Sequence, residues 1–404
     1  MRIAMVSEHA SPLATLGGVD AGGQNVHVAA LATALAGRGH EVVVYTRRDS
    51  WDLRTRVRMT DGVDVVHVPA GPPRPVPKDE LAPYMRDFGR WMARAWTTGP
   101  LPDVVHSHFW MSGLAAAQAA RIVGIPVVHT FHALGTVKRR FQGARDTSPD
   151  DRIDLERSLV GEVDLVISTS HDEISELSRM EADLERTRVV PCGVDLELFT
   201  PDGPAWPRGA RRRLVCIGRL VERKGVDTVV EALTWLPDAE LVVAGGPGAE
   251  ELTDDPEARR LRSVASDLAV DDRLELVGRV DHADIPALLR SADVVAATPW
   301  YEPFGIVPVE AMACGRPVVG SAVGGLLDTV ADGITGLLVP PHDAAAVAAA
   351  VRYLLDDPEL YARFGRAART RAVARFGWNR VAHQTERAYL DVVRSRRIPT
   401  GAAV

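Results

Sequence analysis

Short apolar runs of strand length alternate with longer segments of helical periodicity along most of the chain. This alternation predicts parallel βαβ units and therefore an α/β fold. In the first half, strands are predicted over residues 2–7, 41–46, 63–68, 103–108, 126–131, 164–169 and 188–190. In the second half, they are predicted over residues 214–219, 240–245, 274–277, 293–298 and 317–320. Helices are predicted between the strands, for example over residues 23–38 and 111–123.

A stretch rich in Gly, Pro and Asp, from Cys192 to Ala210, separates the two series of strands. Because 404 residues exceed what one core ordinarily supports, two domains are expected. We place an N-terminal domain at residues 1–195, a C-terminal domain at residues 196–375 and a tail at residues 376–404. Apolar positions at helical spacing predict helix from Pro358 to Arg396. The tail is expected to cross back to the N-terminal domain.

Composition narrows the class of protein. The apolar fraction of 46% is typical of a globular protein, and the net charge of −7 argues against nucleic-acid binding. The three cysteines have no pairing or metal-binding spacing, which indicates reduced thiols and a cytoplasmic location. The N-terminus reads as a strand rather than a signal peptide, and no apolar run reaches membrane-spanning length, so no stable membrane insertion is expected.

Two acids, Glu302 and Glu310, stand with seven residues between them after the strand predicted at 293–298. Glu310 is expected about two turns into the following helix, which Gly315 closes. Ligands of open α/β sheets bind at the carboxyl ends of strands, and N–H groups at helix N-termini attract anions. The pattern predicts two acids that grip sugar hydroxyls on either side of an anion. A capping role for Glu302 with a solvated Glu310 is the structural alternative.

Arg219 and Lys224 lie on one loop beyond another predicted strand, where they are able to clasp a pyrophosphate. Charge-assisted hydrogen bonds of this kind contribute about 1.5–3 kcal/mol each. A solvated basic turn is the alternative, and the later Glu302 loop favours the clasp. Gly22 and Gly23 follow the first strand and open the first helix, which predicts close backbone approach to a ligand.

Two other chemistries are disfavoured. The run from Ala244 to Gly248 follows a strand, but a dinucleotide fingerprint would need glycine where Glu251 stands. His132 ends the strand predicted at 126–131, with His129 upstream, and His106 and His108 alternate on a similar strand. Metal binding by these histidines lacks a carboxylate or Cys partner at ordinary spacing, so no metal site is expected.

Together these residues resemble the retaining glycosyltransferases of family 4. These enzymes have the GT-B fold, in which two Rossmann-like parallel-sheet domains face each other across a cleft. The resemblance covers nearly the whole chain, from Met1 to about Val393. The likeness is greatest to the mycothiol-pathway N-acetylglucosaminyltransferase that acts on inositol phosphate and to sucrose-phosphate synthases. Beyond the Glu302–Glu310 and Arg219–Lys224 pairs, the segments that carry it are 11–13, 20–25, 77–78, 106–113 and 129–134.

The resemblance implies a nucleotide-diphosphate sugar donor, UDP- or GDP-linked, held mainly by the C-terminal domain. The expected donor site comprises Gly22, Gly23, Arg219, Lys224, Arg279, Glu302, Phe304, Gly305, Ile306, Val307 and Glu310. Glu310 would bind the ribose, and Arg219 and Lys224 the pyrophosphate. Glu302 and the N–H groups at 304–306 would hold the sugar, while Arg279 would lie beside the base. His132, Glu302, Arg219 and Lys224 are the expected catalytic residues.

The resemblance also implies transfer with retention at the anomeric carbon, with the leaving phosphate taking the acceptor proton and no metal or other cofactor required. The acceptor would bind in the N-terminal domain, at Asn25, Lys78, Phe109, Ala133, Lys138 and Arg152. Phe109 and Ala133 depart from the Tyr and the Thr or Ser of the similar enzymes, whose hydroxyls help bind the acceptor's phosphate. The acceptor is therefore expected to carry no phosphate or to carry it differently.

The sequence is therefore interpreted as that of a retaining hexosyltransferase of secondary or thiol metabolism. Its acceptor would be a cyclitol, a sugar, a thiol metabolite or a natural-product intermediate. Alternatives are a membrane-associated mannosyltransferase with a lipid acceptor, for which Trp91 and Trp96 give some support, an epimerase, and a nonenzymatic nucleotide-sugar-binding protein. A homodimer stays an open alternative.

Overall fold

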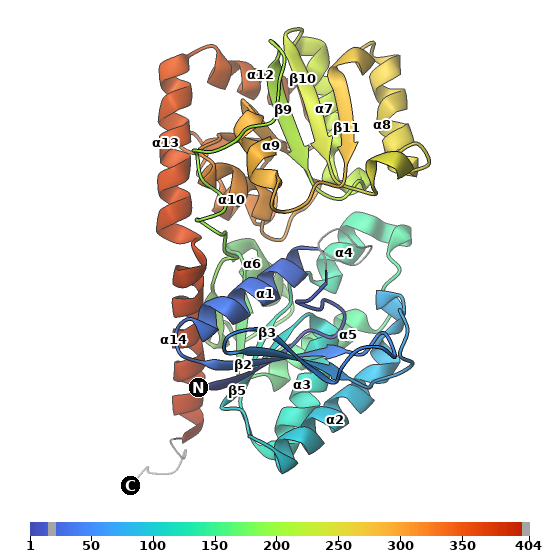
Figure 1. Cartoon of the computed structure of the whole chain (residues 1–404), viewed down its shortest axis with the longest axis vertical. Coiled ribbons are helices and arrows are strands. Elements are labelled where there is room, and N and C mark those ends of the chain that lie inside the picture. Colours follow the sequence, from blue (N-terminus) through green and yellow to red (C-terminus); the bar gives the residue numbers. More distant parts are fainter. Residues whose placement is uncertain (15–21, 398–404) are drawn as a thin grey trace. The chain divides into compact units, whose positions relative to one another are not determined.

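The computed structural model describes residues 1–14 and 22–397, and these residues form two compact units. One unit contains Met1–Pro191 together with the C-terminal segment that begins at Trp378, and the other is Cys192–Gly377. The expected boundaries at 195 and 375 lie within a few residues of these divisions. The C-terminal segment thus belongs to the same unit as the N-terminus (Figure 1).

The first unit is built on an eight-stranded sheet with the order β3-β4-β2-β1-β5-β6-β7-β8. Its strands are β1 (Arg2–Val6), β2 (Glu41–Arg47), β3 (Arg56–Thr60), β4 (Val63–Val68), β5 (Val104–His108), β6 (Val127–Thr130), β7 (Leu165–Ser168) and β8 (Thr187–Val189). All neighbours are parallel except β3, which pairs antiparallel with β4 at the edge.

Helices cover both faces of this sheet. The helices of the unit are α1 (Gly23–Ala36), α2 (Met85–Thr98), α3 (Trp110–Val123), α4 (Gly135–Gln142), α5 (Arg152–Glu162), α6 (His171–Arg179) and α14 (Trp378–Arg397). Apolar residues of α1 and α14 pack in one core with alternate residues of β1, such as Ile3 and Met5. Helix α3 packs against α2 and α5. Because successive side chains of a strand point to opposite faces of the sheet, apolar residues of the strands contribute to a core on each face.

The second unit has a fully parallel six-stranded sheet with the order β11-β10-β9-β12-β13-β14. Its strands are β9 (Arg212–Ile217), β10 (Ala239–Ala244), β11 (Leu274–Gly278), β12 (Val294–Ala297), β13 (Val318–Ser321) and β14 (Gly336–Val339). Its helices are α7 (Val226–Ala232), α8 (Pro256–Asp267), α9 (Ile285–Ser291), α10 (Ile306–Ala313), α11 (Leu326–Thr329), α12 (Ala344–Leu355) and α13 (Pro358–Arg375). One apolar core contains α7, α8 and α12, and the other contains α9, α10 and α13.

The strand order of each sheet reverses beside its first strand. In the first sheet the chain proceeds from β1 towards β2 and then returns to place β5 on the other side of β1. In the second sheet it proceeds from β9 towards β10 and returns to place β12 beside β9. At such switch points the loops that follow the two central strands diverge and leave a crevice for a ligand. The loops after β1, β5, β9 and β12 are therefore the places to look for sites.

The predicted α/β class, with two parallel-sheet domains, is confirmed. Two strands were missed, β3 and β14. Strand β3, with the sequence Arg-Val-Arg-Met-Thr, is short and carries two arginines, so its apolar signal is weak. The helical tail divides at Gly377 into α13 and α14, and these two helices lie in different units.

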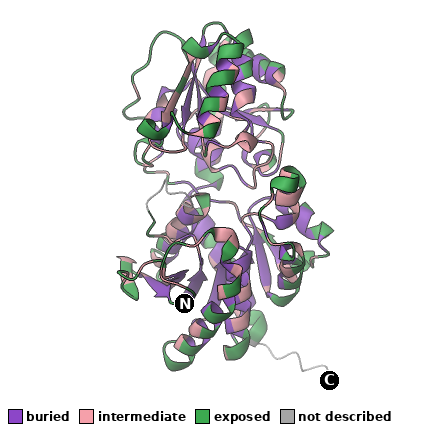
Figure 2. Cartoon of the chain, turned by 90° about the vertical axis from the view of Figure 1, so that its right-hand side faces the viewer, coloured by how far each residue is buried: buried purple, intermediate pink, exposed green. Residues whose placement is uncertain are grey.

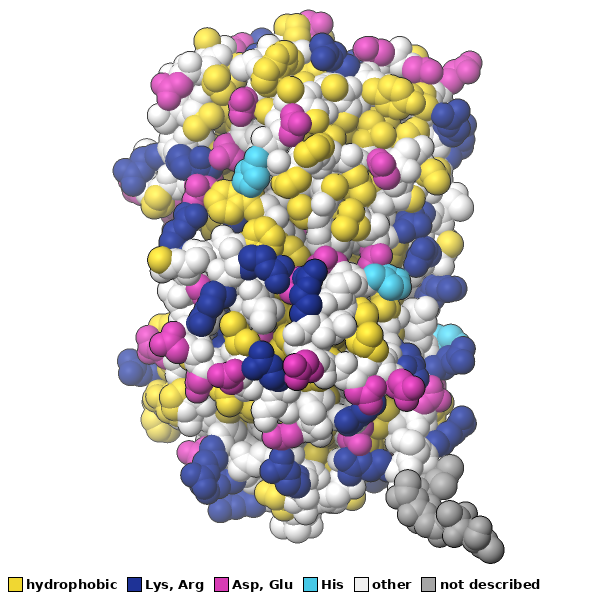
Figure 3. All heavy atoms as spheres, turned by 180° about the vertical axis from the view of Figure 1, so that it is seen from behind, with side chains coloured by type: hydrophobic (Ala, Val, Ile, Leu, Met, Phe, Trp, Pro, Cys, Tyr) yellow, Lys and Arg dark blue, Asp and Glu magenta, His cyan; other side chains and the backbone are white. Residues whose placement is uncertain are grey.

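Buried residues concentrate on the strands and on the inner sides of the helices (Figure 2). On the face shown in Figure 3, Lys and Arg side chains are interspersed with Asp and Glu side chains. No described helix combines the length and the hydropathy that a membrane crossing requires. Trp96, which suggested a membrane face, is only 2% exposed and donates its Nε1–H to the Tyr45 hydroxyl at 3.0 Å.

Tyr389 offers a direct test of how α14 is held on the first unit. Its side chain is fully buried, and its hydroxyl lies 2.6 Å from His106 Nδ1 on β5. Tyr389→Phe leaves that buried nitrogen without its partner, so it should lower the free energy of unfolding by about 1–3 kcal/mol. Urea denaturation followed by circular dichroism measures this. Tyr353→Phe, at a residue that is 58% exposed on α12, should change little, and equal losses would contradict the account.

Candidate functional site

In the second unit, the loop after β9 is held tightly against the loop after β12. Gly225 has φ +63°, and a Cβ there would collide with the Thr298 carbonyl oxygen. The Thr298 hydroxyl donates to the Gly225 carbonyl at 2.7 Å, and the Trp300 N–H donates to the Arg223 carbonyl at 2.9 Å. The two loops that flank the switch point are thereby fixed to each other, which positions the side chains they carry.

Lys224 and Glu302 meet at this junction. The Lys224 ammonium donates a short hydrogen bond to a Glu302 carboxylate oxygen, and both side chains are about one-fifth exposed. Burial alone would raise the pKa of Glu302, but Lys224, Arg223 and Arg219 more than offset this, so the pKa lies below its usual value. One ionised carboxylate therefore faces three cations, and the group keeps an excess of positive charge for an anionic ligand.

The loop that follows Glu302 feeds the N-terminus of α10. Gly305 is the N-cap with φ +90°, and it supplies no side-chain cap. Among the described residues, no protein acceptor pairs with the N–H groups of Phe304, Gly305 or Ile306. Unpaired N–H groups at a helix start are available to an anion or to sugar oxygens. Val307 lies within the first turn of the same helix.

Two further glycines, Gly324 and Gly325, press against this loop and were not singled out from the sequence. A Cβ at Gly324 would collide with the Glu302 carbonyl oxygen, and one at Gly325 with that of Pro303. The Gly325 N–H donates to the Glu302 carbonyl at 2.8 Å. The segment after β13 therefore supports the Glu302 loop through backbone contact that no side chain would permit.

Glu310 is buried on α10 and is only 6% exposed. The prediction that it lies two turns into the helix is wrong, because Gly305 begins the helix late and Glu310 is its fifth residue. His282 Nε2 lies 3.4 Å from Glu310 Oε1. This contact raises the pKa of His282, with burial acting against it. His282 was missed because it stands alone in a loop of the sequence.

Arg279 comes after another strand of the same sheet. It follows β11, and its N–H donates to the Pro247 carbonyl, in the loop after β10, at 2.9 Å. The structure thus gathers Arg219, Lys224, Glu302 and the start of α10 at the junction of the β9 and β12 loops. The expected place of Arg279 beside the base stays a prediction.

In the first unit, the residues expected near the acceptor divide into two groups. Asn25 and the two glycines belong to the start of α1; Asp20 and Ala21, which precede them, lie outside the described residues. The Gly22 N–H donates to Asn25 Oδ1 at 3.0 Å, and Asn25 Nδ2 donates to the Ser11 carbonyl at 3.0 Å. Both ends of the Asn25 amide are therefore used to shape the loop that leads into the helix.

The second group surrounds the Phe109 ring, which follows β5. Lys78 Nζ lies 5.4 Å and the Arg152 guanidinium 5.1 Å from the ring centroid. Arg152 also donates to the Ala133 carbonyl at 2.7 Å, and both Arg152 and Lys138 donate to the Ser148 hydroxyl. The five predicted positions Lys78, Phe109, Ala133, Lys138 and Arg152 thus form one cluster. Phe109 itself has φ +79°, an unusual backbone conformation for a large side chain.

Carboxylates already accompany the cations of this cluster. Arg152 Nε donates to Glu156 Oε1 at 2.7 Å, and both side chains are almost completely buried. Lys138 Nζ lies 3.1 Å from Asp146 and 3.7 Å from Asp79. Burial alone would raise the pKa of Asp79, but a hydrogen bond from Thr147 and the nearby cations, Lys78 among them, lower it. The positive charge of the cluster is therefore balanced within the protein.

A carboxylate–imidazole pair, missed from the sequence, lies beside Phe109. His9 Nδ1 is 2.6 Å from Glu8 Oε1, and the His9 ring packs edge-on against Phe109 with centroids 5.0 Å apart. Glu8 is 1% exposed and also accepts a short hydrogen bond from the Ser112 hydroxyl. The two residues lie in the loop after β1, which is the signal that could have identified them. They place a polar side chain next to an otherwise apolar ring.

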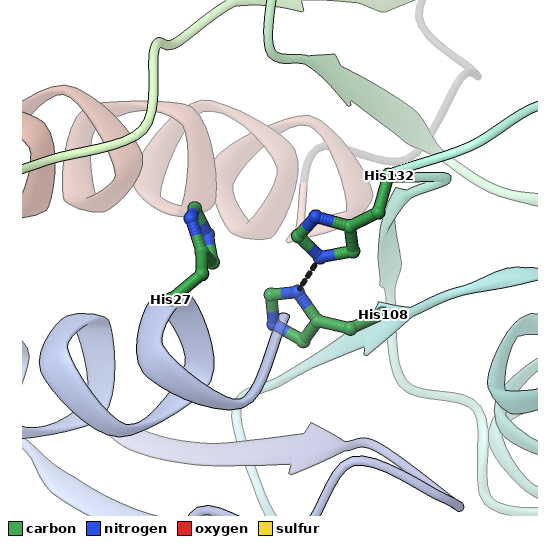
Figure 4. A group of neighbouring side chains, drawn as sticks. All are labelled: His27, His108 and His132. Atoms are coloured by element: carbon green, nitrogen blue, oxygen red, sulfur yellow. Dashed lines mark hydrogen bonds between the residues drawn. The ribbon is translucent and has the colours of Figure 1, made fainter. Parts of the chain in front are cut away.

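His132 lies beyond β6 with φ +59°, and its Nε2 is 3.0 Å from His108 Nδ1 (Figure 4). His129 points to the other face of the sheet, where its Nδ1 lies 2.8 Å from the Ser107 hydroxyl. The neighbour that the sequence did not suggest is His27 of α1, whose ring centroid is 5.0 Å from that of His132. His27 stands one turn before Leu31 on the buried face of α1. A histidine among the apolar positions of an amphipathic helix is a feature of the sequence from which a buried role could have been predicted.

Both halves of the chain match known glycosyltransferase families. Residues 21–198 match the family described as Glycosyltransferase Family 4, and residues 207–371 match the family described as Glycosyl transferases group 1. The chain is 38% identical to a D-inositol 3-phosphate glycosyltransferase of Xylanimonas cellulosilytica, with 98% of each chain covered. A protein of the same name from Acidothermus cellulolyticus is 37% identical, with 98% of this chain and 91% of that one covered.

Solved structures give the same picture of the fold. Sucrose-phosphate synthase from Thermosynechococcus elongatus superposes with a TM-score of 0.87 at 32% identity, over 98% of this chain and 99% of that one. The HepE protein of Anabaena, in complex with UDP and glucose, has a TM-score of 0.71 at 21% identity, over 96% and 98% of the two chains. At that identity the second likeness supports the fold alone.

The Lys224–Glu302 pair should make stability depend on pH. The pKa of folded Glu302 lies below the ordinary value of 4.5. The ionised carboxylate therefore contributes to the free energy of unfolding above that pH, and this contribution is lost as the pH falls through the folded pKa. Glu302→Gln should therefore show a deficit in urea midpoint that is nearly constant from about pH 7 to about pH 5.5 and shrinks as the pH falls below about 4.5. Glu231→Gln, at an exposed residue of α7, is the control. A deficit that stays constant down to about pH 3 would contradict the assignment.

Proposed function

Because the chain belongs to the family 4 glycosyltransferases with the GT-B fold, we propose that it moves a hexose-type sugar from a nucleotide-diphosphate sugar to a small polar acceptor that carries no phosphate. Membership of the family makes the chain a glycosyltransferase. The observation that carries the proposal is the charge balance around Phe109. There, the cations expected to hold an acceptor phosphate are already accompanied by protein carboxylates.

The donor side of the proposal rests on the excess of cations at the junction of the β9 and β12 loops. Arg219, Lys224 and the N–H groups at the start of α10 suit the pyrophosphate, whose charge they would neutralise as the bond to the sugar breaks. Glu302 is ionised at neutral pH and is held in place by Lys224, so it is able to accept hydrogen bonds from sugar hydroxyls. Glu310, buried on the same helix, suits the ribose hydroxyls.

The chemistry then requires little beyond orientation and charge stabilisation. In the proposed reaction the anomeric carbon–oxygen bond breaks, the acceptor oxygen or sulfur attacks from the same face, and the leaving phosphate takes the acceptor's proton. Configuration at the anomeric carbon is thereby retained. His132 aligns sugar and acceptor, and no metal or other cofactor takes part, since Arg219 and Lys224 balance the developing charge.

The acceptor side argues against a phosphate ligand. A phosphate at Arg152 would have to compete with Glu156 for a guanidinium that is almost fully buried, and displacing a partner from a buried pair is costly. Lys138 is similarly engaged by Asp146 and Asp79. Beside these paired cations, the Phe109 ring and the polar His9 side chain lie in contact. This combination of an apolar ring and a polar group suits an uncharged polyol or a thiol.

A lipid acceptor has less support. Of the two tryptophans that suggested a membrane face, Trp96 is buried, and Trp91 packs against Tyr45 with ring centroids 6.5 Å apart. Their aromatic surface contributes to the packing of α2 on the sheet rather than forming an exposed belt.

An acceptor assay tests the proposal. Each of UDP-glucose, UDP-N-acetylglucosamine and GDP-mannose is supplied with free inositol or fructose and with inositol phosphate or fructose 6-phosphate. Product is followed by mass spectrometry. We expect the unphosphorylated member of a pair to be used at least about tenfold more efficiently, because the phosphate would lose one or more charge-assisted hydrogen bonds. Efficient transfer to a phosphorylated member would contradict the proposal.

Glu310→Ala should weaken nucleoside diphosphate binding by about 1–3 kcal/mol, the scale of lost hydrogen bonds to a charged group. Isothermal titration calorimetry of the full chain measures the affinity directly. Glu231→Ala, which removes an exposed carboxylate from α7, is the matched control and should bind as the wild type does. Unchanged affinity in Glu310→Ala would remove its role at the ribose.

A further inference from the structure

We propose that His27, His108 and His132 form a binding site for Zn²⁺ or a chemically similar transition-metal ion, and that the bound ion inhibits sugar transfer. One ligand nitrogen from each histidine lies within 4.8 Å of the other two. The three side chains come from α1, the end of β5 and the loop after β6, and Figure 4 shows them converging on one place. All three elements belong to the first unit, so the site does not depend on the second.

Burial of the three imidazoles restricts which groups can reach their ring nitrogens. His27 is 5% exposed and His108 is fully buried, while His132 is half-buried and provides the side from which an ion enters.

Hydrogen bonding leaves these histidines incompletely satisfied. Among the described residues, buried His27 Nδ1 and His108 Nε2 have no hydrogen-bond partner. The one contact within the group, between His108 Nδ1 and His132 Nε2, holds a single proton between two nitrogens 3.0 Å apart. If the rings adopt the tautomers that protonate their other nitrogens, both facing nitrogens present lone pairs, and an ion takes the place of that proton. Their spacing is close to that of two ligands on one tetrahedral ion.

The donor set selects the class of ion. Imidazole nitrogens suit Zn²⁺, Cu²⁺, Ni²⁺ and Co²⁺, whereas Mg²⁺ and Ca²⁺ require oxygen ligands. Three histidines leave the fourth tetrahedral position open, so the ion would be exchangeable rather than a fixed structural metal. The Trp378 ring, 5.4 Å from that of His27 in an edge-on contact, restrains the orientation of the histidine on α1.

Inhibition follows from the identity of one ligand. His132 is the residue that aligns the sugar and the acceptor in the proposed function, and an ion bound to it withdraws that side chain from the reaction. Only this inhibitory effect rests on the proposed function; binding of the metal does not.

Binding is tested first, with the tag-free full-length chain and no sugar substrate. Co²⁺ titration should give the visible absorption of a tetrahedral ion at one equivalent, and Zn²⁺ should abolish it. Zn²⁺ should also raise the melting temperature of the wild type, because it binds only the folded state. His27→Gln should weaken Zn²⁺ binding at least about tenfold, the effect of a lost ligand or orienting group. His383→Gln, which removes an exposed surface histidine of α14, should bind as the wild type does.

The result that overturns the proposal is equal Zn²⁺ affinity in wild type and His27→Gln, or no one-equivalent binding and no shift in the wild-type melting temperature. The wild-type measurements decide the matter even if His27→Gln fails to fold. If binding is confirmed, Zn²⁺ should slow transfer by the wild type at concentrations that spare His27→Gln. A chain that binds Zn²⁺ yet transfers no sugar would refute the proposed function and leave the metal site standing.

Discussion

The reversal of strand order beside the first strand of each sheet is the constraint on which the sites depend. The loops that follow the neighbouring strands β9 and β12 lie at the carboxyl ends of those strands, and the Gly225–Thr298 contact fixes the two loops together. Between β1 and β5 the reversal places His9 against Phe109. The candidate site of each unit therefore lies at the carboxyl ends of the two strands that flank the switch point.

The two sites differ in how their charge is balanced. In the second unit, the single carboxylate of Glu302 faces Arg219, Arg223 and Lys224, and the surplus suits a pyrophosphate. In the first unit, Arg152 pairs with Glu156 and Lys138 with Asp146, so little charge remains for a ligand. In the proposed function, this contrast assigns the anionic donor to the second unit and an uncharged acceptor to the first.

Much of the fold was predictable because most strands are apolar and regularly spaced. Strand β3 escaped because an antiparallel edge strand with arginines at alternate positions shows no buried run. The two glutamates and two cations of the second unit were singled out because they lie in segments that come after predicted strands. Their pairing was not, since the Lys224–Glu302 contact depends on β9 and β12 being neighbours. His27 escaped for the same reason, because its neighbours His108 and His132 are distant in sequence. Glu8 adjoins its partner His9 but belongs to no recognised local motif.

The central claim is that the junction of the β9 and β12 loops recognises the pyrophosphate of a nucleotide-linked sugar. The most direct measurement is calorimetric comparison of uridine, guanosine and adenosine diphosphates with the corresponding monophosphates. For the preferred base, the account predicts that the diphosphate binds about 10- to 100-fold more tightly, the effect of one charge-assisted hydrogen bond of about 1.5–3 kcal/mol. Equal affinity for the mono- and diphosphate, or no binding of any of the three diphosphates, would contradict it.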